Sequence, residues 1–81
     1  MKIAIKRILS DYEARTGEKV SQDSLAREMV AKGLFRSFAS AKGMMQYTIS
    51  GKAKSLDTEM IRFFMERFDL KLEDVITDIY N

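Results

Sequence analysis

The chain contains no cysteine, no histidine and no proline. Without cysteine it can form neither a disulfide framework nor a thiolate metal site, so apolar burial alone has to stabilise the core. Without histidine it also lacks the commonest general base and the commonest metal ligand. These absences argue against catalysis, and we expect no catalytic residues, no metal site and no cofactor.

Long hydrophobic runs are also missing. No stretch approaches the roughly 20 apolar residues that a membrane span requires. The N-terminal residues 1–7 mix charges with apolar side chains, whereas a signal peptide separates a basic start from an apolar run. We therefore expect a cytoplasmic protein. A length of 81 residues, 46% of them hydrophobic and 32% charged, is typical of one small globular domain, here residues 1–81.

Acidic residues are absent from one part of the chain. Residues 1–54 have a net charge of +6 and residues 55–81 have −4, although the whole chain has only +2. Residues 32–54 contain five lysines and arginines and no acid, interspersed with serine, threonine, tyrosine and glutamine. A surface that approaches polyphosphate excludes carboxylates, and it supplies cations for the phosphates and amide and hydroxyl groups for hydrogen bonds. A solvated surface that happens to be basic is the alternative.

Apolar residues recur at helical spacing along most of the chain, which predicts an all-α fold of five helices. The expected helices cover about 3–15, 22–32 after a Ser21 cap, 38–50 after a Ser37 or Ser40 cap, a segment after a Ser55 cap, and Leu72 to the C-terminus. Glycines at 17, 33 and 51 mark three helix ends. A strand at Lys2–Lys6 competes with the first helix. In the third helix, Ala41, Met44 or Met45, and Thr48 or Ile49 are expected to face inward.

Thr16-Gly17 is followed by the run Ser21-Gln22-Asp23-Ser24-Leu25-Ala26, which contains a polar cap, a glutamine and a Leu-Ala pair. This run resembles the second helix of the repressor and Cro group of phage and bacterial helix-turn-helix regulators, which opens in the same way. Ser50-Gly51-Lys52, Ser55-Leu56-Asp57-Thr58 and Leu72-Glu73-Asp74-Val75-Ile76 are similar to the end of its recognition helix, its fourth helix and its last helix. The resemblance implies a lambda-repressor-like domain with its helix-turn-helix at about 21–51. The chain departs from the family between Lys32 and Ser40, where it has an extended segment instead of a tight turn.

The resemblance also implies a function: a sequence-specific, double-stranded DNA-binding transcription regulator whose recognition helix, about 38–50, enters the major groove. On its outward face Gln46 can bond the N6/N7 edge of adenine, Lys42 can reach guanine O6/N7, and Tyr47 or Ser50 can bond a phosphate. Gly43 lets the helix sit closer to the groove. No acid or base lies near Gln46 in the sequence, so its amide is expected to be free.

Outside that helix the family match predicts that Gln22, beside Ser21, contacts a phosphate. Lys52 and Lys54 are expected to be nonspecific phosphate anchors, and Phe35 and Phe38 are expected to be core residues. The full set of expected DNA-binding residues is Ser21, Gln22, Arg36, Ser40, Lys42, Gly43, Gln46, Tyr47, Ser50, Lys52 and Lys54.

The acidic C-terminal third is expected to serve a different partner. Ile79 and Tyr80 extend the apolar stripe of the last helix, which suggests homodimerisation through that helix and matches a palindromic operator. Folding of Ile79 and Tyr80 back onto the first helix is the alternative. The rival function for the whole chain is a small helical protein-interaction module, such as an antitoxin, an antirepressor or a phage inhibitor, that binds an acidic protein partner.

Overall fold

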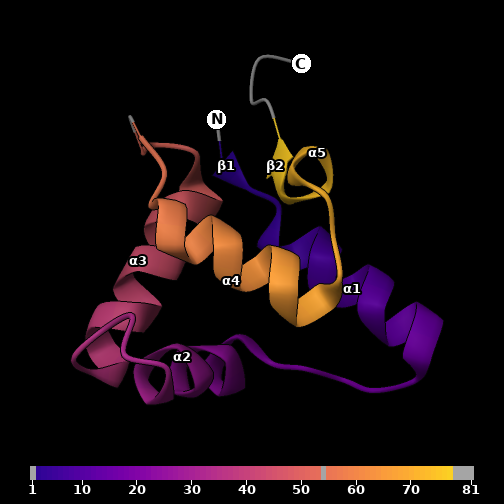
Figure 1. Ribbon diagram of the computed structural model, residues 1–81, viewed down its shortest axis with the longest axis horizontal. Helices are drawn as coiled ribbons and strands as arrows, with labels where there is room; N and C mark the ends of the chain where they lie inside the picture. The colour runs from indigo at the N-terminus through magenta and orange to yellow at the C-terminus, as the bar shows by residue number, and fades with distance from the viewer. Residues whose placement is uncertain (1, 54, 78–81) are drawn as a thin grey trace.

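The protein is mostly helical. Its structure, a computed structural model, describes residues 2–53 and 55–77 (Figure 1). In that part of the chain the elements are β1 (Lys2–Ile3), α1 (Ile5–Thr16), α2 (Gln22–Ala31), α3 (Phe38–Ser50), α4 (Thr58–Phe68), α5 (Leu72–Val75) and β2 (Ile76–Thr77). The five expected helices are therefore present, and a short pair of strands is added to them.

The start of the chain forms part of each of its two expected structures, a strand and a helix. Lys2–Ile3 forms a strand, and the helix begins only at Ile5. β1 pairs antiparallel with β2, with Lys2 opposite Thr77 and Ile3 opposite Ile76. The amide of Ala4 then donates to the carbonyl of Val75 at 2.8 Å. The two ends of the described chain are thus held side by side.

Helix α2 begins and ends as its sequence predicts. The Ser21 hydroxyl accepts a hydrogen bond from the Ser24 amide at 3.1 Å and caps the helix. At the other end Gly33 has φ +81°, its amide donates to Val30, and the Leu34 amide donates to Met29. These two bonds form a Schellman motif, which favours glycine at this position.

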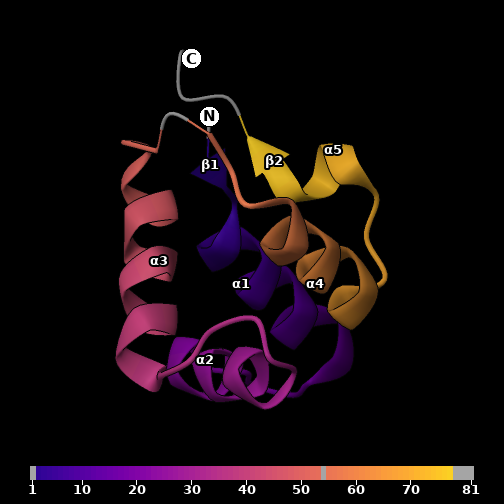
Figure 2. The same cartoon turned by 60° about the vertical axis from the view of Figure 1, so that its left-hand side comes forward.

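Residues 32–37 connect α2 to α3, and the Ser37 hydroxyl caps α3 by accepting from the Ser40 amide at 3.1 Å. The third helix therefore starts after Ser37, the earlier of its two expected caps. Its buried side chains are Ala41, Met45 and Thr48 rather than Met44 and Ile49. Figure 2 shows α3 upright at one side of the molecule, with α2 crossing its lower end.

The two phenylalanines of this region differ. Phe35 packs against the core as expected, whereas the expectation was wrong for Phe38, which is 39% exposed. Phe38 begins α3 at the surface, where the Arg27 guanidinium lies 5.2 Å from its ring centroid. A cation over the ring gives this aromatic side chain a stable place outside the core.

The predicted cap of α4 was wrong. Asp57, not Ser55, is the N-cap, and its carboxylate accepts from the amides of Glu59 at 2.8 Å and Met60 at 3.2 Å. Both residue types are good caps, but the carboxylate of Asp57 accepts from two amides of the first turn, and Asp57 directly precedes the start of the helix at Thr58.

The predicted last helix was wrong in its length. α5 ends at Val75, and Ile76–Thr77 continues as a strand. Val75, Ile76 and Thr77 are three consecutive β-branched residues, which favour a strand once β1 offers a partner. Ile79 and Tyr80, on which the expected dimer interface rests, lie outside the described residues.

One core joins these elements. Its largest fully buried side chains come from every part of the chain: Ile3, Ile5, Leu25, Met29, Met45, Met60, Phe64 and Val75. Phe64 stacks on Phe68 with ring centroids 6.0 Å apart, and Tyr12 meets Phe68 edge to face at 5.1 Å. In the described part of the chain, no helix has the length and apolar character needed to cross a membrane.

Candidate nucleic-acid interface

The exposed face of α3 is formed by small or uncharged polar side chains. Apart from Phe38, which begins the helix, the exposed residues of α3 are Ala39, Ser40, Gly43, Gln46, Tyr47 and Ser50. None of them is a carboxylate, in agreement with the acid-free sequence of residues 32–54. We call these six residues the α3 face. A surface of mostly short side chains without negative charge is suited to close approach by a polyanion.

Gln46 is held by a residue from α2. Its Nε2 donates a hydrogen bond to Oε1 of Gln22 at 2.8 Å. Gln22 is the first residue of α2 and is half-buried, whereas Gln46 is exposed. The expectation of a free Gln46 amide was therefore wrong, because the partner lies 24 residues earlier in the sequence. The hydrogen bond fixes the direction in which the remaining amide groups point.

Lys42 is also held from α2, by an ion pair. Its Nζ lies 2.7 Å from Oδ1 of Asp23. The hydrogen bond from Lys42 and its positive charge lower the pKa of Asp23, and the charge of Arg27 adds to this effect. The lysine side chain is only 29% exposed. Asp23, which follows Gln22 in the sequence, was missed because an acid on another helix leaves no local signal in the α3 segment.

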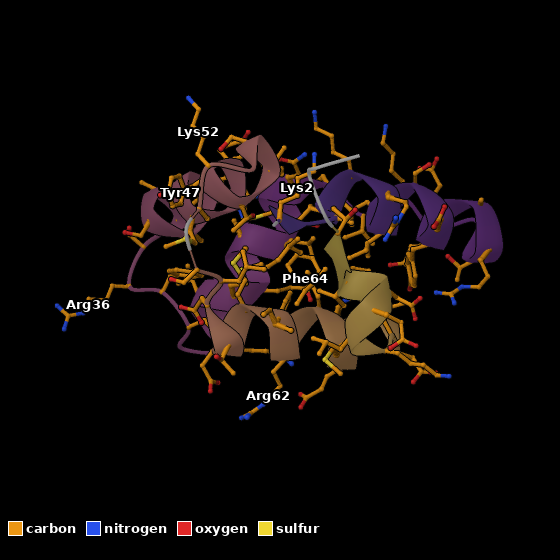
Figure 3. All side chains as sticks on the ribbon, turned by 90° about the horizontal axis from the view of Figure 1, so that it is seen from above. Lys2, Arg36, Tyr47, Lys52, Arg62 and Phe64 are labelled. Carbon is orange, nitrogen blue, oxygen red and sulfur yellow. The ribbon has the colours of Figure 1, made fainter. Side chains whose placement is uncertain are left out.

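The hydroxyl groups at the C-terminal end of α3 bond to the protein itself. Ser50 Oγ donates to the Tyr47 carbonyl at 2.7 Å and accepts from the Lys52 amide at 3.2 Å. The Tyr47 hydroxyl makes a longer contact of 3.4 Å with the Lys52 carbonyl. These bonds order the chain beyond Gly51, where φ is +76°. The Lys52 side chain remains exposed beside Tyr47 (Figure 3), and Lys54 lies outside the described residues.

The remaining expected site residues occupy two further places. Ser21 is the cap of α2, and Ser40 Oγ accepts a hydrogen bond from Ser37 Oγ at 3.0 Å. Arg36 lies in the connection before α3, and its side chain extends away from the body of the protein (Figure 3). The structure thus brings Gln22, Lys42 and Gln46 together, and it leaves Arg36 apart from them.

Gly43 lies in the middle of the α3 face. A Cβ atom placed there would meet no described atom within 4 Å. Its backbone is helical, so neither packing nor conformation within the described protein requires glycine. The position is open on the side from which a ligand would approach.

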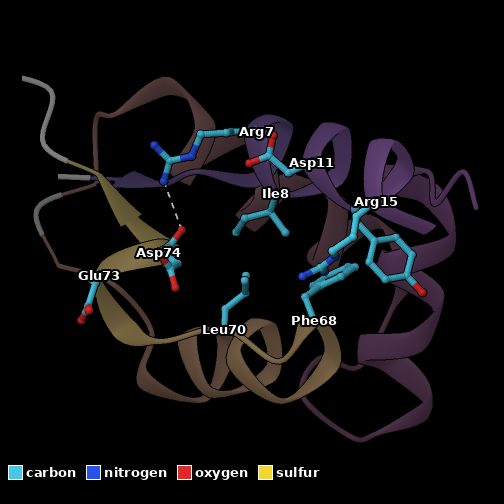
Figure 4. Close-up of a pocket in the computed structure, with 9 residues that line it drawn as sticks. Arg7, Ile8, Asp11, Arg15, Phe68, Leu70, Glu73 and Asp74 are labelled. Carbon is cyan, nitrogen blue, oxygen red and sulfur yellow. Dashed lines mark hydrogen bonds between the residues drawn. The ribbon is translucent and has the colours of Figure 1, made fainter. Parts of the chain in front are cut away.

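A surface hollow of about 430 Å³ lies away from α3, between α1 and the segment from the end of α4 to α5 (Figure 4). Ile8, Phe68 and Leu70 contribute apolar surface, and two arginines and three carboxylates surround them. Arg7 crosses part of it to donate to the Asp74 carbonyl at 3.1 Å. Among the described residues, no group of three acidic side chains is close enough to hold a metal ion.

In comparisons with known proteins, no family model, no curated protein and no solved structure matches this chain.

Proposed function

We propose that the chain is a sequence-specific DNA-binding transcription regulator of the helix-turn-helix kind, with α3 as the recognition helix. The observation that carries this proposal is the hydrogen bond from Gln46 to Gln22. It orients an exposed amide on a helix face that has no acid. An oriented amide is what a protein needs to read the edge of a base.

The glutamine pair leaves the right groups for this task. Gln46 uses one N–H on Gln22 and retains its second N–H and its carbonyl oxygen. Adenine presents N7 as an acceptor and N6–H₂ as a donor in the major groove, which matches these two groups. Because Gln22 holds the amide in place, less side-chain entropy is lost when the base is bound.

Gln22 contributes a backbone contact in the same proposal. Its oxygen accepts from Gln46, so its two N–H donors are left for a phosphate. It begins α2, and the free amides at a helix N-terminus attract anions as well. Lys52, exposed just beyond α3, supplies a cation to a neighbouring phosphate.

The test begins with selection of preferred duplexes from a random DNA library, followed by fluorescence anisotropy on the selected and scrambled duplexes at several salt concentrations. The parent protein should bind with a steep salt dependence and a preference for the selected sequence. Gln46→Ala should lose about 1–3 kcal/mol on the selected duplex and little on the scrambled one. An unchanged ratio between the two affinities would remove Gln46 from sequence reading.

Two further variants complete the design. Gln22→Ala should weaken binding to both duplexes, because it removes a phosphate contact and releases Gln46. Arg62→Ala is the matched control, since this exposed cation of α4 points away on the opposite side from Lys52 (Figure 3). If the parent protein binds no duplex, the acid-free segment of residues 32–54 is better assigned to an acidic protein partner, as in an antitoxin, an antirepressor or a phage inhibitor.

A further inference from the structure

A second, smaller hollow of about 230 Å³ borders α3 on the side of the strand pair. It is lined by β1, the first turn of α1, Thr77 of β2 and Ile49 of α3. Ile49 lies one residue before Ser50 of the α3 face, and α3 packs directly against β1. This hollow, which we call the β1 groove, therefore borders the helix that carries the α3 face.

The described charged residues around the β1 groove are of one sign. The charged residues that line it are Lys2, Lys6 and Arg7, and none of its described lining residues is an acid. The larger hollow between α1 and α5, by contrast, combines two arginines with three carboxylates. An apolar floor whose described rim charges are all cationic is complementary to the sugar-phosphate backbone, which presents apolar sugar surface and anionic phosphates.

Lys6 and Arg7 lie in the first turn of α1, where the helix dipole disfavours cations. That turn contains no acid, and no side chain caps it among the described residues. Arg7 gains a hydrogen bond to the Asp74 carbonyl, but Lys6 is exposed and forms no ion pair with a described acid. Lys6 therefore has no compensating interaction among the described residues, and its charge is available to an anionic partner.

We propose that the β1 groove binds the sugar-phosphate backbone of the duplex that α3 reads, with Lys2 and Lys6 contacting its phosphates. The proposal rests on the proposed DNA-binding function. Lys2, Tyr47 and Lys52 lie in the same half of the view in Figure 3, whereas Arg62 points to the opposite side. One DNA strand can thus follow the border of α3 from Lys52 toward α1.

The test compares two double variants that remove the same charge. Lys2→Gln with Lys6→Gln should bind selected and scrambled duplexes about 10-fold more weakly, with a salt slope lower by about two, one unit for each phosphate that is no longer neutralised. Arg62→Gln with Lys71→Gln should keep the parent slope, because both side chains are exposed on the side of α4 and α5. Equal slopes for the two double variants would overturn the proposal.

A cross-linking measurement reports the proximity of DNA directly. The chain has no cysteine, so Thr77→Cys introduces a single thiol at the groove, which can carry a short photoreactive group. Illumination with the selected duplex should attach this variant to DNA, whereas the same group on Glu66→Cys, exposed on α4, should not attach. A parent protein that binds no DNA contradicts the proposed function itself. Parent binding with the expected drop in specificity for Gln46→Ala, but no cross-link at position 77, contradicts the groove alone.

Discussion

At the scale of single residues, Gly43 is a position where the fold does not require glycine, whereas a closely bound ligand would favour it. Glycine inside a helix costs about 1 kcal/mol relative to alanine, and nothing in the described protein requires it here. Gly43 therefore lowers the stability of α3, and no contact within the described protein compensates for this loss. A missing side chain is useful if DNA lies close to the helix at this point.

Gly43→Ala should raise the free energy of unfolding by about 0.5–1 kcal/mol and weaken binding to the selected duplex, because the added methyl group meets the DNA. Urea denaturation and anisotropy measure the two effects on the same sample. Gly51→Ala is the contrasting variant: it should destabilise the protein, since φ is +76° there. If Gly43→Ala gains stability and binds DNA as well as the parent, close approach at this position is excluded.

Asp23 provides a second prediction at this scale. Its pKa is lowered by Lys42, so its ionised form stabilises the folded state above the ordinary carboxyl pKa, and that contribution is lost as the pH falls through the lowered value. Asp23→Asn should therefore lose stability at neutral pH and show a smaller decline in stability on acidification than the parent. Urea unfolding at a series of pH values tests this.

The same substitution should change DNA binding. Lys42, released from Asp23, becomes available to phosphates, and one carboxylate is removed from the start of α2. Affinity for scrambled duplexes should rise more than affinity for the selected one. Glu59→Gln is the matched control, because it breaks the exposed pair with Arg62 on α4. Similar gains in both variants would indicate a general charge effect.

At the scale of the helices, the caps give a direct comparison. Asp57→Ala removes an acceptor from two amides and should cost about 1 kcal/mol of stability, whereas Ser55→Ala should cost almost nothing. Thermal unfolding of the two variants decides between the observed cap and the one expected from sequence. A larger loss for Ser55→Ala would mean that α4 begins earlier in solution.

Helices and their caps could be read from the sequence where the signal is local. Ser21 and Gly33 delimit α2 through bonds to residues within five positions, and a single sequence contains that information. Contacts between distant segments could not be read in this way. The Gln22 to Gln46 bond depends on how α2 crosses α3, and the β1–β2 pair depends on the whole chain closing.

The candidate site follows the same division. The acid-free segment identified the α3 face, because the outward positions of a helix follow from its inward ones. The state of each side chain did not follow. Lys42 is paired and Gln46 is oriented because two residues of α2 reach across to them. The cations of the β1 groove were also missed, since Lys2 and Lys6 join α3 only through the tertiary fold.

At the scale of the whole molecule, association with a second copy is still a prediction. Val75 is fully buried in its own core and cannot contact a partner, whereas Leu72 of α5 is 51% exposed. We expect the parent to sediment as a dimer on a palindromic duplex and Leu72→Asp to sediment as a monomer there, with unchanged circular dichroism. A parent protein that remains one copy per duplex at high concentration would contradict dimerisation.

The pairing of β1 with β2 also has a consequence for the order of folding. Ile3 and Ile76 pair although almost the entire described chain lies between them, and closing so long a loop is entropically costly. Contacts within and between neighbouring helices can form earlier at a smaller cost. The strand pair should therefore form after the transition state, so that weakening it accelerates unfolding while the refolding rate hardly changes. The strength of the pairing between β1 and β2 therefore sets the unfolding rate, and with it the lifetime of the native state.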